Sequence, residues 1–226
     1  MENKYQIIAL IGESAAGKDY IQNLTCRNHP LMFHKIVSCT TRPMRENESP
    51  DEAYHFISLE DFTRKVLNGD MLEATEYRDW FYGTPIESLS LEKINIGVFN
   101  PAAVDALLED PRLDVLVLFV DTNDKTRMLR SLNREEEPDC AEICRRYFAD
   151  KKDFADIDFE YYVIKGDDSI PDPDIMAQSE DFLSDIKTMW SSVTTETGFS
   201  TIVRWENSML AKATESETAN DKDKIE

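Results

Sequence analysis

The chain has 226 residues, enough for one compact domain with a sizeable hydrophobic core. Its 45 acidic side chains outnumber the 25 basic ones, and the formal net charge of −20 at pH 7 disfavours binding of nucleic acid through its phosphates. The four cysteines form no C-x-x-C pair, no apolar run could span a bilayer and the N-terminus has no signal-peptide pattern, so we expect a reduced, cytoplasmic protein without membrane contact.

The N-terminal part of the chain is predicted to form a strand, a loop and a helix. Tyr5–Ile11 is almost continuously apolar, as in a strand that is buried on both faces of a parallel sheet. A glycine-containing loop follows, and Lys18–Arg27 carries apolar residues along one helical face. Phe33–Ser38 is predicted to be a second strand.

The middle of the chain, about residues 38–84, is predicted to be a small β-rich insert. It starts with a polar loop at Thr40–Glu52, and a short strand is expected at Tyr54–Ile57. The other elements predicted there are a capped helix from Ser58 to just before Gly69, a strand at Met71–Tyr77 and a turn at Tyr82–Pro85.

Regular alternation of strands and helices is predicted after residue 85. The expected elements are strands at Ile94–Phe99, Leu113–Val120 and Tyr161–Ile164, and helices at Ala102–Leu108, Asn123–Leu132, Ala141–Phe154 and Ile175–Trp190. This order predicts an α/β fold with a mainly parallel sheet flanked by helices. Residues 191–226 form a C-terminal extension whose polar end, Ala211–Glu226, is predicted to be disordered.

A phosphate-binding loop is the clearest motif in the sequence. Gly12–Lys18 fits the pattern G-x-x-x-x-G-K between a predicted strand and a predicted helix, the context that this pattern requires. Its backbone N–H groups and the following helix N-terminus would form a nest for a triphosphate, with Lys18 reaching the β- and γ-phosphates. The candidate ATP-binding residues are Gly12, Glu13, Ser14, Ala15, Ala16, Gly17, Lys18 and Asp19.

Asp19 occupies the position where such loops usually carry a Ser or Thr that ligates Mg²⁺. A carboxylate is a hard oxygen ligand and suits this ion. Asp19 is therefore the candidate ligand for a Mg²⁺ ion that is bound together with ATP.

Several further motifs follow one another in a characteristic order. The loop Val37–Arg45 gathers two arginines and several hydroxyls, and Tyr54-His55-Phe56, Leu72-Glu73 and Phe81-Tyr82-Gly83-Thr84 come after it. In this order they resemble the guanylate kinase family, whose members share a Ser-x-Thr-Thr-Arg-x-x-Arg loop, a Tyr-x-Phe motif and a Glu before a Tyr-Gly-Thr/Ser turn. The resemblance covers about residues 5–190. It implies a P-loop NTPase core at 1–37 and 85–190, a GMP-binding insert at 38–84 and a helical lid at 125–155.

The resemblance also implies a GMP site in the insert. Its residues would be Ser38, Arg42, Arg45, Tyr54 and Tyr82 for the phosphate, and Glu73 and Thr84 for the base. The chemistry agrees, because arginine forks match phosphate oxygens, and a carboxylate can accept from the guanine N1–H and 2-amino groups together. Adenine offers no such pair of donors, and buried hydrogen bonds of this kind reject the wrong base by a factor of about 10⁴.

Arginines recur in the predicted lid. Arg130 and Arg134 are four residues apart and so share one helical face. By the resemblance, the lid arginines of the reaction are Arg130, Arg134 and Arg146, with Arg145 as an alternative to Arg146. Together with Lys18 and Arg42 they form the candidate catalytic group. They would neutralise charge during transfer of a phosphoryl group from ATP to GMP or dGMP.

Asn100 departs from the family pattern, because an Asp-x-Asp motif is common near the end of this strand and Asn supplies no charge. Three functions stay open at this point. The chain is an active guanylate kinase, a kinase for another (deoxy)nucleoside monophosphate, or a catalytically inactive protein-binding module. Glu73 and Thr84 argue against the second, and the intact Gly12, Gly17 and Lys18 argue against the third.

Overall fold

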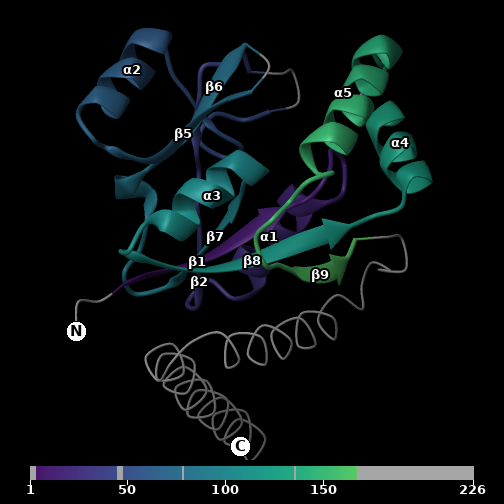
Figure 1. Ribbon diagram of the computed structural model, residues 1–226. Helices are drawn as coiled ribbons and strands as arrows, with labels where there is room; N and C mark the ends of the chain where they lie inside the picture. The colour runs from purple at the N-terminus through teal and green to yellow at the C-terminus, as the bar shows by residue number, and fades with distance from the viewer. Residues whose placement is uncertain (1–3, 45–47, 78, 135, 167–226) are drawn as a thin grey trace, which may run out of the picture. The chain divides into compact units, whose positions relative to one another are not determined.

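The computed structural model describes residues 4–44, 48–77, 79–134 and 136–166 (Figure 1). These residues all belong to one compact unit within positions 1–172. The helix expected at Ile175–Trp190, the C-terminal extension at 191–226 and the candidate GMP ligand Arg45 lie outside the described residues. No helix in the described ranges is long and apolar enough to cross a membrane.

A five-stranded parallel sheet forms the centre of the fold, which confirms the predicted α/β class. The strand order is β2-β7-β1-β8-β9, and every neighbouring pair is parallel. The bounds are β1 (Tyr5–Ile11), β2 (Phe33–Lys35), β7 (Ile94–Val98), β8 (Leu113–Asp121) and β9 (Tyr162–Lys165). Strand β1 has a neighbour on each side and residues 7–11 are fully buried, as its continuous apolar sequence predicted.

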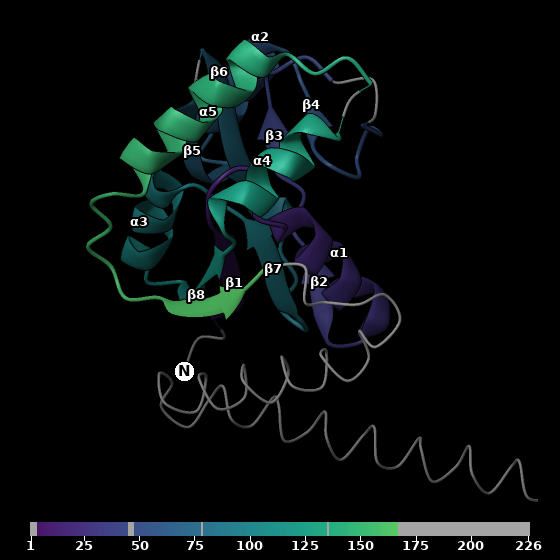
Figure 2. The same cartoon turned by 90° about the vertical axis from the view of Figure 1, so that its right-hand side faces the viewer.

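Two helices cover opposite faces of this sheet, as the two views show (Figures 1 and 2). Helix α3 (Pro101–Glu109) packs Val104 and Leu107 into a core with Ile7 and other β1 side chains. Helix α1 (Lys18–Asn28) lies on the other face. There the Gln22 amide donates to the carbonyls of Ile36 and Ile96 at 3.0 and 2.8 Å. Because Gln22 bonds the backbone of the sheet, it fixes α1 and the loop before it.

The insert has its own four-stranded sheet in the order β4-β3-β6-β5. Its elements are β3 (Cys39–Thr40), β4 (His55–Phe56), α2 (Leu59–Leu67), β5 (Met71–Tyr77) and β6 (Trp80–Pro85), followed by the short 3₁₀ helix η1 (Ile86–Ser88). Helix α2 begins at the predicted cap, where Ser58 Oγ accepts from the backbone N–H of Asp61 at 3.0 Å. Strand β3 was not expected from the sequence, because its two residues lie in and beside the polar loop.

The predicted turn at Tyr82–Pro85 is wrong, since these residues belong to β6. The reversal occurs before them, where Tyr77 pairs with Trp80 and Asp79 has φ of +66°. Gly83 lies inside the strand for a steric reason. A Cβ there would come 2.8 Å from the Glu73 carbonyl oxygen, so the glycine permits close approach of two backbones rather than a turn.

Helices α4 (Asp124–Leu132) and α5 (Cys140–Asp153) form a helical hairpin after β8. Both helices have side-chain N-caps, because Asn123 and Asp139 accept from the backbone N–H groups of Thr126 and Glu142. The hairpin stands beside the carboxyl ends of the parallel strands (Figure 1), where open α/β sheets bind their ligands.

Candidate active site

The phosphate loop joins β1 to α1 at the carboxyl edge of the sheet. Gly12 has φ of +144°, and a Cβ there would lie 2.7 Å from the Val120 carbonyl oxygen. Gly17 has φ of +106° and directly precedes the helix. Both glycines are therefore required by backbone geometry, which explains their place in the motif.

Lys18 is folded back into this loop. Its Nζ donates to the carbonyls of Gly12 at 2.6 Å and Glu13 at 3.0 Å. Burial lowers the pKa of the ammonium group, and the nearby carboxylates of Asp19 and Asp150 oppose that effect. The ammonium is thus held at the loop that the motif assigns to phosphates.

Asp19 lies in the first turn of α1 and lines the same cleft as Lys18 and Arg42. Within the described ranges no group of three or more His, Cys, Asp or Glu side chains could hold a metal ion.

Three of the candidate GMP residues form a hydrogen-bonded chain in the insert. Glu73 and Thr84 are direct partners in the β5–β6 register. The Thr84 hydroxyl donates to Glu73 Oε1 at 2.7 Å, and the Ser38 and Thr84 hydroxyl oxygens are 3.0 Å apart. Burial raises the pKa of Glu73 to about 7, an effect that the bond from Thr84 partly opposes. The second oxygen, Oε2, is buried and has no hydrogen-bond partner among the described residues.

Arg42 is held by a residue that sequence reasoning missed. Its guanidinium makes a bidentate pair with Glu48, at 2.8 Å for both contacts. It also lies over the rings of Tyr54 and Phe56, 5.5 and 5.4 Å from their centroids. The sequence offered only a weak signal for Glu48, an acidic side chain six positions along a polar loop.

A cleft of about 300 Å³ brings most of the predicted residues together. Its lining comes from the phosphate loop, the insert and the α4–α5 hairpin, with Gly12, Ser14, Ala15, Lys18, Asp19, Ser38, Arg42, Tyr54, Glu73, Tyr82, Arg134, Arg145 and Arg146. Tyr54 and Tyr82 pack edge to face there, with centroids 5.7 Å apart. Thr84 is not in the lining, because it is fully buried behind Glu73.

Arg130 lies outside this cleft, in a neighbouring cavity of about 480 Å³ that also borders Gly17 and Lys18. Its Nη1 donates to the carbonyls of Ala15 at 3.4 Å and Ala16 at 3.2 Å. Arg134 lines both cavities. The predicted lid arginines therefore divide between two adjoining spaces that meet at the phosphate loop.

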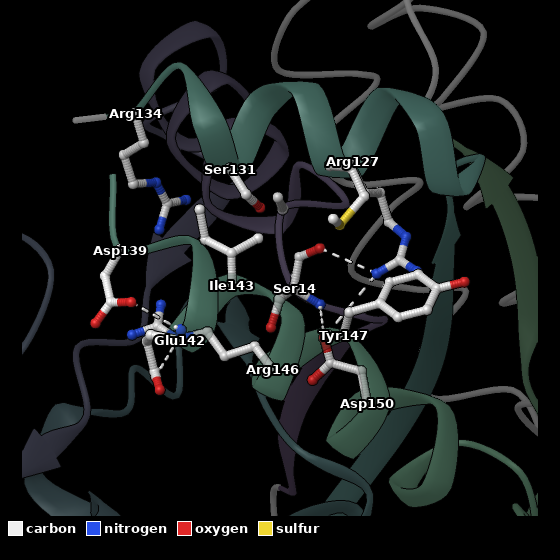
Figure 3. Close-up of a pocket in the computed structure, with 12 residues that line it drawn as sticks. Ser14, Arg127, Ser131, Arg134, Asp139, Glu142, Ile143, Arg146, Tyr147 and Asp150 are labelled. Carbon is white, nitrogen blue, oxygen red and sulfur yellow. Dashed lines mark hydrogen bonds and ion pairs between the residues drawn. The ribbon is translucent and has the colours of Figure 1, made fainter. Parts of the chain in front are cut away.

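Glu142 holds both candidates for the third lid arginine. Its oxygens accept from Arg145 at 2.6 and 2.7 Å and from Arg146 at 2.7 Å. The pair with Arg145, followed by Arg146, lowers the pKa of Glu142 to about 2. Both arginines line the cleft, and Arg146 also borders the small pocket between the lid helices and the loop (Figure 3). Glu142 thus positions both arginines at the cleft.

Arg127 is a further functional candidate that sequence reasoning passed over. It is 2% exposed and its guanidinium lies 3.0 Å from Glu13 Oε2 and 2.7 Å from Asp124 Oδ1. It also donates to the Ser14 carbonyl at 3.2 Å, so it joins α4 directly to the phosphate loop. The spacing of Asp124 and Arg127, three residues apart on a helix, was the available signal.

Asn100 serves as the N-cap of α3. Its Oδ1 accepts from the Ala103 N–H at 2.8 Å, and its Nδ2 donates to the Thr75 hydroxyl at 3.0 Å. Both Asn100 and Thr75 line the cleft. The amide therefore has a structural role at the position where the sequence departs from the family pattern.

A family profile matches most of the chain. The profile of the family described as "Guanylate kinase" matches residues 4–185. The guanylate kinase of Latilactobacillus sakei subsp. sakei is 37% identical over 87 residues, 38% of this chain and 43% of that protein. The guanylate kinase of Nostoc sp. is 36% identical over 84 residues, 37% of this chain and 42% of that protein. The chain thus aligns with less than half the length of these curated relatives.

A solved structure supports the fold. The guanylate kinase from Anaplasma phagocytophilum aligns with 87% of this chain and 90% of its own, with a TM-score of 0.53 and 19% sequence identity. The family profile extends over most of the chain and includes the phosphate loop, the second sheet and helices α4 and α5. On these grounds the chain belongs to the guanylate kinase family.

Proposed function

We propose that this protein is a cytoplasmic kinase that transfers the γ-phosphoryl group of ATP to GMP or dGMP and yields ADP with GDP or dGDP. One observation carries the proposal. The cleft that contains Lys18 of the phosphate loop also contains the buried carboxylate of Glu73, whose Oε2 has no hydrogen-bond partner among the described residues. Such an acceptor is what a guanine N1–H and 2-amino group would satisfy.

Each part of the site has a role in this reaction. The loop amides and Lys18 bind the phosphates of ATP, and Arg42, Tyr54 and Tyr82 bind the phosphate of GMP. An oxygen of the GMP phosphate attacks the γ-phosphorus of ATP as the bond to the ADP oxygen breaks. That oxygen is already anionic, so no side chain needs to remove a proton. Charge at the transferred group is neutralised by Arg134 with Arg145 or Arg146.

Arg45, outside the described residues, is a further proposed phosphate ligand by its place in the motif. Arg130 is proposed to act on the ATP side, because it borders the cavity next to Gly17. Residues 38–84 are proposed as the GMP-binding insert and 125–155 as the lid, with the core at 1–37 and 85–190. Closure of the lid would exclude water and so suppress hydrolysis of ATP.

Asp19 is the proposed Mg²⁺ ligand, since its carboxylate lines the cleft beside Lys18. The ion, when bound with ATP, would neutralise phosphate charge. The carboxylate adds a negative charge at the N-terminus of α1, so binding of ATP without the ion should be weakened.

A coupled ADP-release assay tests the proposal. ATP and Mg²⁺ are supplied with GMP, dGMP, AMP, dTMP or dCMP in turn. We expect turnover with GMP or dGMP at a kcat/KM at least about 10⁴ times that with AMP. Faster turnover with dTMP or dCMP would identify a kinase for another nucleoside monophosphate. No turnover by folded protein would favour a module that binds protein partners.

A further inference from the structure

Asp150 of the lid helix α5 makes an unexpected contact with the phosphate loop. Its Oδ2 accepts from the backbone N–H of Ser14 at 2.7 Å (Figure 3). The residue is 3% exposed, and its bond to Ser14 is partly buried. Ser14 is the third residue of the phosphate loop, whose amides form the predicted nest for the triphosphate. A protein carboxylate therefore occupies an N–H group of the kind that binds phosphate.

The same carboxylate connects three parts of the molecule. Oδ1 accepts a long bond, 3.4 Å, from the Tyr77 hydroxyl of the insert strand β5. Oδ2 is 4.0 Å from Arg127 Nη1 of α4. Asp150 thus reaches the loop, the insert and both lid helices. Its charge also partly opposes the lowering of the Lys18 pKa that burial causes.

Other contacts hold the lid at the loop independently of Asp150. Glu13 Oε2 lies 3.0 Å from Arg127 Nη2, and Glu13 Oε1 lies 3.1 Å from Lys151 Nζ. These pairs use a side chain of the loop and leave its amides available. The contact of Asp150 differs from them, because it uses an amide of the anion-binding nest itself.

We propose that the Asp150 carboxylate competes with the phosphate groups of ATP for the backbone N–H of Ser14. It holds the lid against the loop before ATP binds, and it must leave the Ser14 amide when ATP binds. The inference rests on the proposed function in that it takes ATP as the ligand of the loop. Its physical basis is charge and geometry. A carboxylate at hydrogen-bond distance from the nest repels a triphosphate, and a state in which the nest is filled binds ATP only after it opens. Asp150 therefore sets the affinity for ATP.

Calorimetry of ATP binding in the presence of Mg²⁺ tests this role in the full-length chain. Asp150→Asn removes the charge with little change of shape, and Asp150→Ala also removes the acceptor. Asp156→Asn is the matched control, because it deletes an exposed carboxylate just beyond the end of α5. We expect a dissociation constant about tenfold lower in Asp150→Asn, at least as low in Asp150→Ala, and unchanged in the control.

Inorganic tripolyphosphate and adenosine separate competition from a general structural effect. If Asp150 competes with phosphate, both Asp150 variants bind tripolyphosphate more tightly by a factor similar to that for ATP, whereas adenosine binding does not change. ATP binding that is equal or weaker in folded Asp150→Asn, as judged by thermal unfolding, overturns the inference. Absence of ATP binding by all four proteins instead refutes the proposed function on which the inference rests.

Discussion

The hydroxyl of Thr84 donates to Glu73 Oε1 at 2.7 Å across the β5–β6 pair, and Glu73 Oε2 is buried without a hydrogen-bond partner in the described part of the chain. The hydrogen bond from Thr84 orients the carboxylate and gives a donor to only one of its two oxygens. A buried acceptor in this condition is unfavourable for folding and favourable for a ligand that brings donors. The pH dependence of Glu73 follows from this arrangement.

The KM for GMP should depend on the ionisation of Glu73. Its pKa is raised to about 7 by burial, so the carboxyl group is largely protonated below pH 7. Only the ionised form accepts from two guanine donors, and the KM should therefore rise up to tenfold for each unit that the pH falls below 7. Steady-state kinetics between pH 6 and 8.5 measure this. Glu73→Gln should bind GMP weakly at every pH, and a flat profile in the wild-type protein would contradict the assignment.

Glu73→Gln should also stabilise the fold at alkaline pH. The folded-state pKa of about 7 exceeds the ordinary value of 4.5, so the stability contributed by the protonated group is present below pH 4.5 and is lost as the pH rises through 7. The difference of about 2.5 units corresponds to about 3 kcal/mol. Denaturant unfolding should show Glu73→Gln more stable than the wild type by up to that amount at pH 8, with no advantage at pH 4.5. Equal stability at both pH values would count against a buried, uncompensated carboxylate.

The central sheet could be predicted from the sequence because local patterns determine it. The apolar run of β1 matches Tyr5–Ile11 residue for residue, and the glycine pattern of the phosphate loop matches the backbone angles at Gly12 and Gly17. These features depend on the burial of a strand, which requires apolar residues, and on positive φ, which favours glycine, so both can be recognised in the sequence.

Contacts between distant residues left no such trace. The bond from the Ser14 amide to Asp150 joins residues 136 positions apart, and the pair of Arg42 with Glu48 depends on the path of a polar loop. The turn misassigned at Tyr82–Pro85 has a similar cause. Gly83 is needed there because the backbone of the neighbouring strand lies too close for a Cβ, and the local sequence gives no sign of that contact.

Gly12→Ala should destabilise the protein more than Gly69→Ala. A Cβ at Gly12 would lie 2.7 Å from the Val120 carbonyl oxygen, and an alanine there would also be strained by the φ of +144°. At Gly69 φ is +76° and nothing lies within 4 Å of the added atom, so only backbone strain is expected. We expect a loss of about 3 kcal/mol for Gly12→Ala and about 1 kcal/mol for Gly69→Ala in urea unfolding. Similar losses in the two variants would contradict the close packing of the loop on β8.

Arg42→Ala should raise the KM for GMP roughly 100-fold and lower kcat, because it removes a guanidinium that can bind the GMP phosphate. Glu48→Gln is the control, since it weakens the bidentate pair and keeps the arginine. A much smaller change in this control would indicate that the guanidinium itself acts on GMP. If both variants raise the KM equally, Arg42 acts mainly by ordering the loop that carries Glu48.

Removal of the Asp19 carboxylate should change the requirement for Mg²⁺. The side chain places a carboxylate directly after Lys18, in the first turn of α1, so Asp19→Ala should raise the Mg²⁺ concentration for half-maximal activity roughly tenfold. Asp19→Ser should restore much of this loss, because a hydroxyl is the usual ligand at that position. Asp105→Asn, an exposed site on α3, controls for the loss of one negative charge.

Asn100→Asp tests whether a negative charge at the N-cap of α3 also changes the Mg²⁺ requirement. Aspartate keeps the acceptor for the Ala103 N–H and loses the donor to the Thr75 hydroxyl. Titrations of activity against Mg²⁺ that coincide for all of these proteins would refute a metal role for Asp19.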